Sequence, residues 1–362
     1  MQKVILSVIN DLSTDNRVHK VATTLVKNNY DVTLIGRKLP NSLEINRNYS
    51  TYRFALFFNK GPFFYIEYNI RLFFFLLFKN VDILVANDLD TLLANYLVSV
   101  IRTKKIIYDS HEYFIEVPEL QNRKTVKSVW KFIEKTIVPK LKRTYTVSKP
   151  IADIYNKMYK TDFKVIRNYP NYSENQSSTN IIETSKKVII YQGALNIGRG
   201  IELVIKAMKL IDNAIFAIIG DGDITQSLKN LIIDEGVNDK VLFLGKIPFE
   251  ELHNYTKSAN IGISLEDDTN LNYHYSLPNK LFDYIQAGIP VLVSNLPEMK
   301  KIVQDYNIGE VLMSRKVEDC SKLINDMLTN EIQQIEWKNN LKQAAKELCW
   351  ENQEKELLNI FN

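Results

Sequence analysis

The segment of the chain with the most specific pattern for ligand binding contains a lysine and an aspartate three residues apart. Lys280 and Asp283 follow Pro278, where a helical pattern begins. Proline suits the first turn of a helix, whose free N–H groups and positive dipole end bind phosphate oxygens. The carboxylate of Asp283, one turn later, only accepts hydrogen bonds and so suits two ribose hydroxyls. The segment predicts a site for a phosphorylated ribose, unless the two residues form an ordinary ion pair on a solvated helix face.

A histidine marks a second candidate site. His111 comes directly after the run 105–109, which has the pattern of a buried strand. Ligands of α/β proteins bind at the carboxyl ends of such strands. A histidine that only hydrogen-bonds within its loop is the other interpretation of this position.

Alternating strand and helix patterns surround both sites. Strand-like runs occur at residues 4–9, 32–35, 52–57, 83–86, 105–109, 144–147 and 164–167, and again at 188–192, 215–219, 241–244, 261–264 and 291–293. Amphipathic segments separate most of them. This alternation is typical of parallel sheets with crossover helices, so we predict an α/β protein with two doubly wound, Rossmann-like domains.

The polar stretch 168–186 has no apolar periodicity and has the composition of a linker. The chain of 362 residues is long enough for two domains on either side of it. We therefore predict domains at 1–168 and 169–345. A C-terminal helix over 346–362 could cross back to the N-terminal domain.

Composition excludes several classes of protein. Hydrophobic residues make up 45% of the chain and charged residues 24%, as in globular proteins. The most apolar stretch, 61–78, contains Glu67 and Arg71 and falls short of the ~20 apolar residues of a membrane span. The N-terminus has no signal-peptide pattern. Cys320 and Cys349 lack metal-ligand or redox spacing, which suits a reducing cytoplasm.

Charge is distributed unevenly along the chain. Residues 1–168 hold 27 Lys and Arg against 15 Asp and Glu, a net charge of +12, and the remainder has a net charge of −8. In the basic half, a helical pattern carries lysines along one side, and the nearby run 73–75 is all phenylalanine. This stripe could lie on an anionic membrane surface, or could simply be a solvated helix face. The stripe consists of Lys124, Lys127, Lys131 and Lys135.

Segment 276–291 resembles the donor-binding signature of the retaining GT-B glycosyltransferases, the family described as glycosyltransferase family four and glycosyl transferases group one. That signature has two glutamates separated by seven residues, followed by Gly and Pro-Val. Asp283 falls on the second glutamate position and Tyr275 on the first. The resemblance implies that Asp283 binds the ribose. Tyr275 has a phenol where the family has a carboxylate, and this difference affects which hydroxyls of the donor sugar the site can bind.

Further segments resemble the same family in the expected order. Residues 191–200 resemble the first strand and loop of the donor domain, with Arg199 on the second of two basic positions and Ala194 on the first. Residues 218–222 and 243–247 resemble turns beside the nucleotide, and 15–18 the Asp-x-Arg-Val opening of one branch. The resemblance implies catalytic roles for His111, Arg199 and Lys280, donor binding by Gly193, Gly220, Asp221, Gly245, Lys246, Tyr275, Asn279 and Asp283, and acceptor-side roles for Asp15 and Arg17.

The pair Asp88 and Asp90 matches the Asp-x-Asp metal clamp of the other large glycosyltransferase fold. Because the pair precedes a helical pattern, an aspartate there is better explained as an N-cap. We expect no required metal and no other cofactor. Arg199, Lys280 and helix dipoles would neutralise the diphosphate.

The resemblance implies a retaining glycosyltransferase that moves a sugar from a nucleotide-sugar donor to a glycan or lipid-linked acceptor, in cell-surface polysaccharide or glycoconjugate synthesis. The donor would bind the second domain and the acceptor the basic first domain. We expect a cytoplasmic protein that could be peripheral on the inner face of the membrane, with no nucleic-acid partner. Two alternatives stay open: a nucleotide-sugar 2-epimerase on the same fold, and a degenerate nucleotide-binding partner subunit without turnover.

Overall fold

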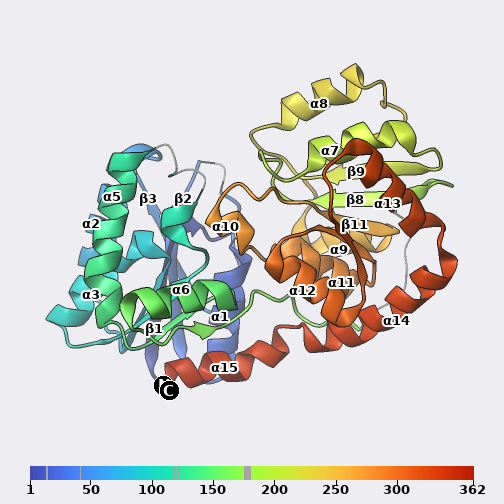
Figure 1. The fold of residues 1–362 in the computed structure, drawn as a ribbon. Coiled ribbons are helices and arrows are strands. Elements are labelled where there is room, and N and C mark those ends of the chain that lie inside the picture. Colours follow the sequence, from blue (N-terminus) through green and yellow to red (C-terminus); the bar gives the residue numbers. More distant parts are fainter. Residues whose placement is uncertain (14, 41, 118–119, 121–122, 175–180) are drawn as a thin grey trace. The chain divides into compact units, whose positions relative to one another are not determined.

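The computed structural model describes residues 1–362 except 14, 41, 118–119, 121–122 and 175–180. The described chain divides into two compact units (Figure 1). Unit 1 consists of Met1–Asn168 together with Gln353–Asn362, and unit 2 consists of Tyr169–Asn352. None of the described helices combines the length and the apolar character that crossing a bilayer requires.

Unit 1 is built on a parallel sheet with the order β3-β2-β1-β4-β5-β6-β7 among its described strands. Its central strands are buried along most of their length because helices cover both faces of the sheet. In β4, for example, every residue from Ile83 to Asn87 is buried. The strands are β1 (Lys3–Asp11), β2 (Asp31–Lys38), β3 (Ser50–Ala55), β4 (Ile83–Asn87), β5 (Lys105–Ser110), β6 (Thr144–Thr146) and β7 (Lys164–Val165).

The strand order of unit 1 reverses beside β1, which pairs with β2 on one side and β4 on the other. Val4 is in register with both Val32 and Ile83. A reversal of this kind opens a crevice at the carboxyl ends of the two strands, where α/β proteins bind ligands. In unit 1 this point lies at the ends of β1 and β4.

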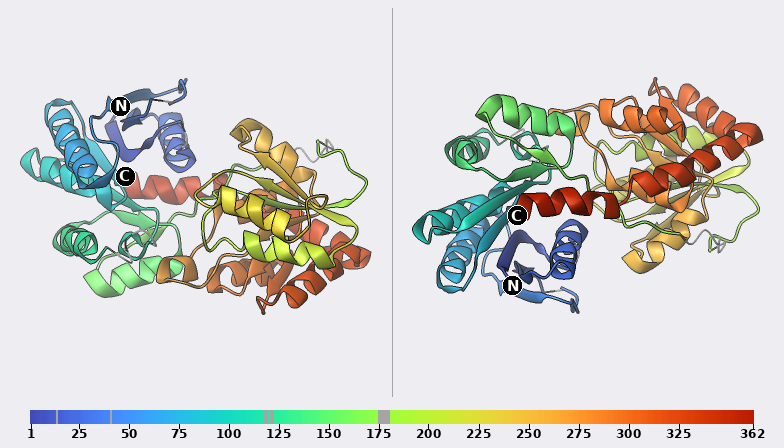
Figure 2. Two further views of the ribbon diagram at one scale, coloured as in Figure 1. Left: turned by 90° about the horizontal axis from the view of Figure 1, so that it is seen from above. Right: turned by 90° about the horizontal axis from the view of Figure 1, so that it is seen from below.

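Helices cover both faces of the unit 1 sheet (Figure 1). Along the chain they are α1 (Asn16–Lys27), α2 (Gly61–Phe78), α3 (Leu89–Ile101), α5 (Lys124–Ile137), α6 (Lys149–Tyr159) and α15 (Glu351–Phe361). From Gln353 onward the last of these belongs to unit 1, although it comes from the C-terminus (Figure 2). It is held against α1, where the hydroxyl of Thr24 donates to Glu354 at 2.8 Å and the ring of Tyr30 meets that of Phe361.

Unit 2 repeats the same plan with a parallel sheet in the order β10-β9-β8-β11-β12-β13 among its described strands. The order reverses beside β8, so the crevice of unit 2 lies where β8 and β11 end. Residues 346–362 contain the end of α14 and all of α15, with a break between them. The strands are β8 (Lys187–Gln192), β9 (Ala214–Ile219), β10 (Val241–Gly245), β11 (Ile261–Ser264), β12 (Val291–Ser294) and β13 (Gly309–Leu312).

The helices of unit 2 pack on its sheet through two apolar clusters. Ile189 and Phe216 point into one cluster, and Ile190 and Ala217 into the other, as strand alternation requires. The helices are α7 (Ile201–Ala207), α8 (Thr225–Asp234), α9 (Phe249–Lys257), α10 (Leu271–His274), α11 (Asn279–Ala287), α12 (Pro297–Tyr306), α13 (Val317–Thr329) and α14 (Glu331–Glu347).

Candidate functional site

A buried carboxylate, Glu266, organises two cations just beyond the end of β11 in unit 2. The Nζ of Lys280 lies 2.5 Å from Oε1 of Glu266, and Nη1 of Arg199 lies 3.5 Å from the same oxygen. The hydroxyl of Ser264, the last residue of β11, donates to Oε2 at 2.8 Å. Lys280 comes from the first turn of α11 and Arg199 from the loop after β8, so the switch point brings them together. The cluster of these three side chains alone carries a net charge of +1.

The pKa values of the three groups reflect this arrangement. Burial raises the pKa of Glu266, but Lys280 and Arg199 outweigh burial and hold it below its ordinary value. Burial also lowers the pKa of Lys280, an effect that Glu266 opposes without cancelling. Glu266 is therefore held in its ionised form, and it is the group that favours the protonated form of Lys280 against burial.

Aromatic rings line the same crevice. The ring of Tyr191 lies 4.3 Å from Nζ of Lys280, and the ring of Tyr273 lies 5.0 Å from Cζ of Arg199. Both contacts are cation–π interactions that fix the direction of the cation. Within the described residues, Nε of Arg199 is buried and donates no hydrogen bond. A buried guanidinium nitrogen without a partner is what an anionic ligand would satisfy.

Three predicted glycines meet at the carboxyl ends of β8, β9 and β10. The amide of Gly193 donates to the carbonyl of Ile219 at 3.0 Å, and that of Gly220 donates to the carbonyl of Gly245 at 2.8 Å. A Cβ on Gly220 would lie 1.9 Å from the carbonyl oxygen of Gly193, and its φ of +134° is unfavourable for other residues. Gly220 is therefore required for the close approach of two loops that border the crevice.

Asp221 and Lys246 form an exposed ion pair of 3.3 Å next to these glycines. The carboxylate of Asp221 also accepts from the hydroxyl of Thr225 at 2.7 Å and from the amide of Gly222 at 2.9 Å. These bonds, together with Lys246, lower the pKa of Asp221. The observed contacts of Asp221 order the turn that leads into α8.

Asp283 lies on α11, one turn after Lys280, and accepts a hydrogen bond of 3.0 Å from the side-chain amide of Gln192. The other end of that amide accepts from Thr256 at 2.6 Å, which fixes the orientation of Gln192. Asn279 is the first residue of α11 and follows Pro278, which occupies the N-cap. Asp283 and Asn279 thus lie on the helix whose N-terminus faces the end of β8.

Tyr275 directly follows α10, and its ring lies edge-on to His274 at 4.7 Å. Nδ1 of His274 is hydrogen-bonded to the carboxylate of Asp268 at 2.9 Å. A further arginine, Arg315, was not singled out from the sequence. Its Nη1 donates to the carbonyl of Leu265 at 3.2 Å, and its guanidinium forms an ion pair with Asp267.

His111 in unit 1 lies between two carboxylates. Its Nδ1 is 3.1 Å from Asp88 and its Nε2 is 3.1 Å from Asp109, so both ring nitrogens have acidic partners. Its backbone amide also donates to Asp88 at 2.7 Å. Burial lowers the pKa of His111, but Asp88 and Asp109 outweigh burial and raise it well above its ordinary value. The two carboxylates therefore favour the imidazolium form of His111, whose two ring N–H groups both donate to them.

Arg17 is buried behind His111 and braces Asp109. Its Nε and Nη2 donate to the two oxygens of Asp109 at 3.0 and 2.8 Å, and Nη1 donates to the carbonyl of Ile166. Burial raises the pKa of Asp109, but Arg17 and His111 outweigh it and lower it to about 2. The resemblance implied a role on the acceptor side for Arg17; its observed contacts orient the His111 cluster.

Asp15 and Asp88 occupy the N-cap positions of α1 and α3. Asp15 caps its helix by accepting from the amide of Val18 at 3.1 Å. The predicted cap bond of Asp88 is not made, because its carboxylate binds His111 instead. Asp88 has φ 62° and ψ 168°, a conformation that costs a non-glycine residue about 1 to 3 kcal/mol. Such strain is typical of functional sites.

Asp90 is buried on α3, and burial raises its pKa well above the ordinary value.

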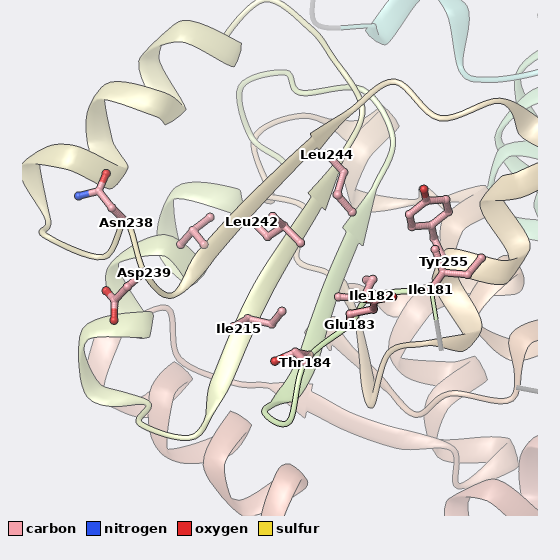
Figure 3. Close-up of a pocket in the computed structure, with 11 residues that line it drawn as sticks. Ile181, Ile182, Glu183, Thr184, Ile215, Asn238, Asp239, Leu242, Leu244 and Tyr255 are labelled. Atoms are coloured by element: carbon pink, nitrogen blue, oxygen red, sulfur yellow. The ribbon is translucent and has the colours of Figure 1, made fainter. Parts of the chain in front are cut away.

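A cavity of about 380 Å³ lies elsewhere in unit 2 (Figure 3). It is lined by Ile181–Thr184, by residues of β9 and β10 such as Ile215 and Leu242, and by Tyr255. Asn238 and Asp239 lie at its margin, just before β10 begins. No site residue predicted from the sequence is among the residues that line this cavity.

Comparison with protein families decides what these two units are. The model for Glycosyltransferase Family 4 matches residues 15–171, and the model for Glycosyl transferases group 1 matches residues 173–348. The two matches follow one another along the chain and leave only its ends and residue 172 uncovered. The chain belongs to the GT-B glycosyltransferases.

Individual relatives agree with this assignment. An uncharacterized glycosyltransferase of Methanocaldococcus jannaschii is 25% identical over 184 residues, which is 50% of this chain and 46% of that protein. The match thus spans less than half of that curated relative. Among solved structures, sucrose-phosphate synthase of Thermosynechococcus elongatus has a TM-score of 0.79 at 15% identity, covering 100% of this chain and 98% of that one.

The Anabaena HepE protein, solved in complex with UDP-glucose, has a TM-score of 0.77 at 12% identity and covers 100% of this chain and 99% of that one. At such low identities these structures show the fold alone. They confirm the predicted fold class, a GT-B fold with two doubly wound Rossmann-like domains.

Within this GT-B chain, the structure brings Arg199, Lys280, Gly193 and Gly220 to one crevice of unit 2 and places His111 at the corresponding strand ends of unit 1. Sequence reasoning missed Glu266, which joins the two cations. The rule that singled out His111 would also have found its position, because Glu266 lies two residues after the end of the apolar strand β11.

Proposed function

We propose that this GT-B protein is a retaining glycosyltransferase whose unit 2 binds a nucleotide-sugar donor and whose unit 1 binds a glycan or lipid-linked acceptor. The observation that carries the proposal is the pair of cations, Lys280 and Arg199, held by buried Glu266 at the switch point of unit 2. A diphosphate is the group of such donors that this pair suits. Bidentate guanidinium contacts and a protonated lysine both favour phosphate oxygens.

The remaining donor contacts follow from the same crevice. Asp283 on α11 would accept hydrogen bonds from the ribose hydroxyls, beside the amide of Gln192 that already orients it. The glycine turns at Gly193, Gly220 and Gly245 would let the nucleotide approach the backbone. Tyr275 and Asn279, at the two ends of the loop before α11, would contribute to sugar and phosphate recognition.

In the transfer step, the protein stabilises the charge that develops on the departing diphosphate. Lys280 and Arg199 are fixed before the reaction by Glu266 and by aromatic rings, so they need no reorganisation. His111 is the group of unit 1 that we propose for the same step, as an imidazolium whose positive charge favours the negative charge that develops on the diphosphate. Its two carboxylate partners would hold it protonated while chemistry proceeds.

We further propose that the protein works in cell-surface polysaccharide or glycoconjugate synthesis, on the cytoplasmic face of the membrane. The lysines of α5 support a contact with anionic headgroups, each contributing about 1 kcal/mol near the surface. Lys124, Lys131 and Lys135 are exposed, whereas Lys127 is partly buried and pairs with Glu116 at 2.8 Å. The electrostatic stripe therefore consists of three of the four lysines identified in the sequence.

The proposal is tested by incubating the purified protein with UDP-, GDP-, ADP- and TDP-sugars, with and without glycan acceptors, and measuring donor consumption. We expect at least one donor to be consumed, and the anomeric configuration of the product, read by NMR, to match that of the donor. Lys280→Met should abolish consumption, whereas Lys209→Met, which removes an exposed lysine paired with Glu235, should not. Epimerisation of a donor without acceptor would replace this proposal with the epimerase alternative.

A further inference from the structure

The outward face of α2 is apolar along the whole helix. Its exposed side chains recur every three or four residues, which places them on one stripe. Phe63 at the first turn is 65% exposed and Phe78 at the last residue is 80% exposed. Within α2, the exposed residues after Pro62 are Phe63, Ile66, Ile70, Phe74 and Phe78. Of the run 73–75, only Phe74 is exposed, because Phe73 and Phe75 pack against the core of unit 1.

The neighbouring helix α3 continues this surface. It packs against α2, and its own exposed residues are Leu93, Leu97, Val100 and Ile101. The loop before α2 adds Phe57 and Phe58, whose amides are held by the carboxylate of Glu67. On ordinary protein surfaces, exposed apolar residues are scattered singly. A continuous apolar surface formed by adjacent elements, as here, marks an interaction site.

Acidic residues of these helices are turned away from the surface. Glu67 on α2 binds the loop amides and forms an ion pair of 2.7 Å with Arg71. Asp90 on α3 is buried, and so is Glu134 on α5, which accepts from the hydroxyl of Tyr159 at 2.6 Å. The fully exposed residues of α2, α3 and α5 in the described chain therefore include no carboxylate.

Lysines border the apolar surface instead. Lys60 and Lys79 are exposed at the two ends of α2, and the exposed residues of α5, which packs against α3, include Lys124, Lys131 and Lys135. Figure 1 shows these helices on the same side of the unit 1 sheet. The surface thus combines an apolar centre with a basic rim. Its charge is complementary to anionic headgroups, and its centre to the acyl chains beneath them.

A second copy of the chain fits this surface less well. In a two-fold interface the same patch meets itself, so the basic rim of one copy would face the basic rim of the other. The exposed positions of the three helices offer no acidic residue to compensate this repulsion.

We propose that the α2–α3 face inserts into the boundary between headgroups and acyl chains of an anionic bilayer, with α2 lying in the plane of the membrane. The inference rests on the peripheral membrane contact proposed above and adds an apolar anchor to it. Lysines alone would give binding that salt disperses, since charge attraction is screened over a Debye length. An inserted apolar face would give binding that persists at high salt.

The experiment is co-sedimentation of the full chain with vesicles of phosphatidylcholine alone or mixed with phosphatidylglycerol, at low and high salt. We expect the wild type to bind the anionic vesicles and to remain partly bound at high salt. The triple variant Phe63→Ser, Phe74→Ser and Phe78→Ser should lose the salt-resistant part of the binding. Its affinity for anionic vesicles should fall by at least roughly tenfold. Changing Lys124, Lys131 and Lys135 to glutamine should remove the salt-sensitive part.

A matched control changes Ile332 and Ile335, two exposed isoleucines of α14 in unit 2, to serine, and should bind vesicles as the wild type does. An environment-sensitive dye on Phe78→Cys should shift to the blue with anionic vesicles; the two native cysteines are buried. Donor consumption should survive the triple phenylalanine change, which separates this inference from the proposed reaction. Wild-type binding that vanishes at high salt would overturn the proposed insertion. A wild-type dimer that the triple phenylalanine variant dissociates would show that a second copy of the chain covers this face instead.

Discussion

Replacing Asp88 by asparagine is expected to lower the pKa of His111 while leaving its surroundings in place. Asparagine has the shape of aspartate, so its oxygen can still accept from the amide of His111. Its NH2 group then replaces the carboxylate oxygen that faces Nδ1, so the charge and the hydrogen-bond acceptor at that ring nitrogen are both lost. A hydrogen bond to a charged group is worth about 1.5 to 3 kcal/mol, and one pKa unit corresponds to about 1.36 kcal/mol. Loss of one of the two carboxylates should therefore lower the pKa of His111 by about one to two units.

The assay is a titration of the histidine ring signals by NMR, which is practical because the chain has 4 histidines. In the wild type, His111 should titrate above its ordinary value, whereas His19 and His253 should titrate below theirs because burial lowers their pKa values. Asp153→Asn, which removes an exposed partner of Lys149 in the same unit, should leave His111 unchanged.

The shift also makes stability depend on pH in a defined direction. The folded state raises the pKa of His111, so its contribution to stability is fully present below the unfolded pKa of about 6.5 and is lost as pH rises through the folded pKa. The free energy of unfolding of the wild type should thus fall as pH rises from about 6.5 to the folded pKa of His111. Asp88→Asn should narrow this pH range, because it lowers the folded pKa. A wild-type His111 that titrates at or below 6.5, or one that Asp88→Asn leaves unmoved, would refute this reasoning.

Three further predictions concern unit 2. Glu266→Gln removes the group that opposes the effect of burial on Lys280, so the nucleotide affinity of the variant should begin to fall at a lower pH than that of the wild type as pH rises. Gly220→Ala should destabilise the protein by more than about 1 kcal/mol in chemical denaturation, because its Cβ would meet the carbonyl of Gly193. Gly236→Ala, also at positive φ but facing open space, serves as its control and should cost less. Removal of divalent metals with EDTA should leave most donor consumption in place, and an absolute metal requirement would contradict charge neutralisation by fixed cations.

Much of the fold could be predicted because both sheets are parallel and covered on both faces. Strands such as β9 and β12 are then almost continuously apolar and stand out from the amphipathic helices. The strand that the pattern missed, β13, contains Gly309 and Glu310 and forms the edge of its sheet, where burial is incomplete. Edge strands are short and less apolar, so they give a weak signal.

The candidate site was predictable in its positions but less so in its contacts. His111 and Lys280 follow from general rules about strand ends and helix starts. Glu266 stands before two aspartates, Asp267 and Asp268, and nothing in the sequence indicates that the first of these three acids is buried. Asp88 resembles an N-cap in sequence, and only the fold reveals that a histidine 23 residues later takes its carboxylate.

The claim that unit 2 binds a nucleotide sugar is tested most directly by calorimetric titration of the protein with UDP-, GDP-, ADP- and TDP-sugars. We predict that the wild type binds at least one of them. Asp283→Ala should weaken that binding by about 1.5 to 3 kcal/mol, since the ribose hydroxyls lose a charged acceptor. His111→Ala should leave the affinity nearly intact. Absence of binding to every member of the panel, or equal losses in the two variants, would contradict the claim.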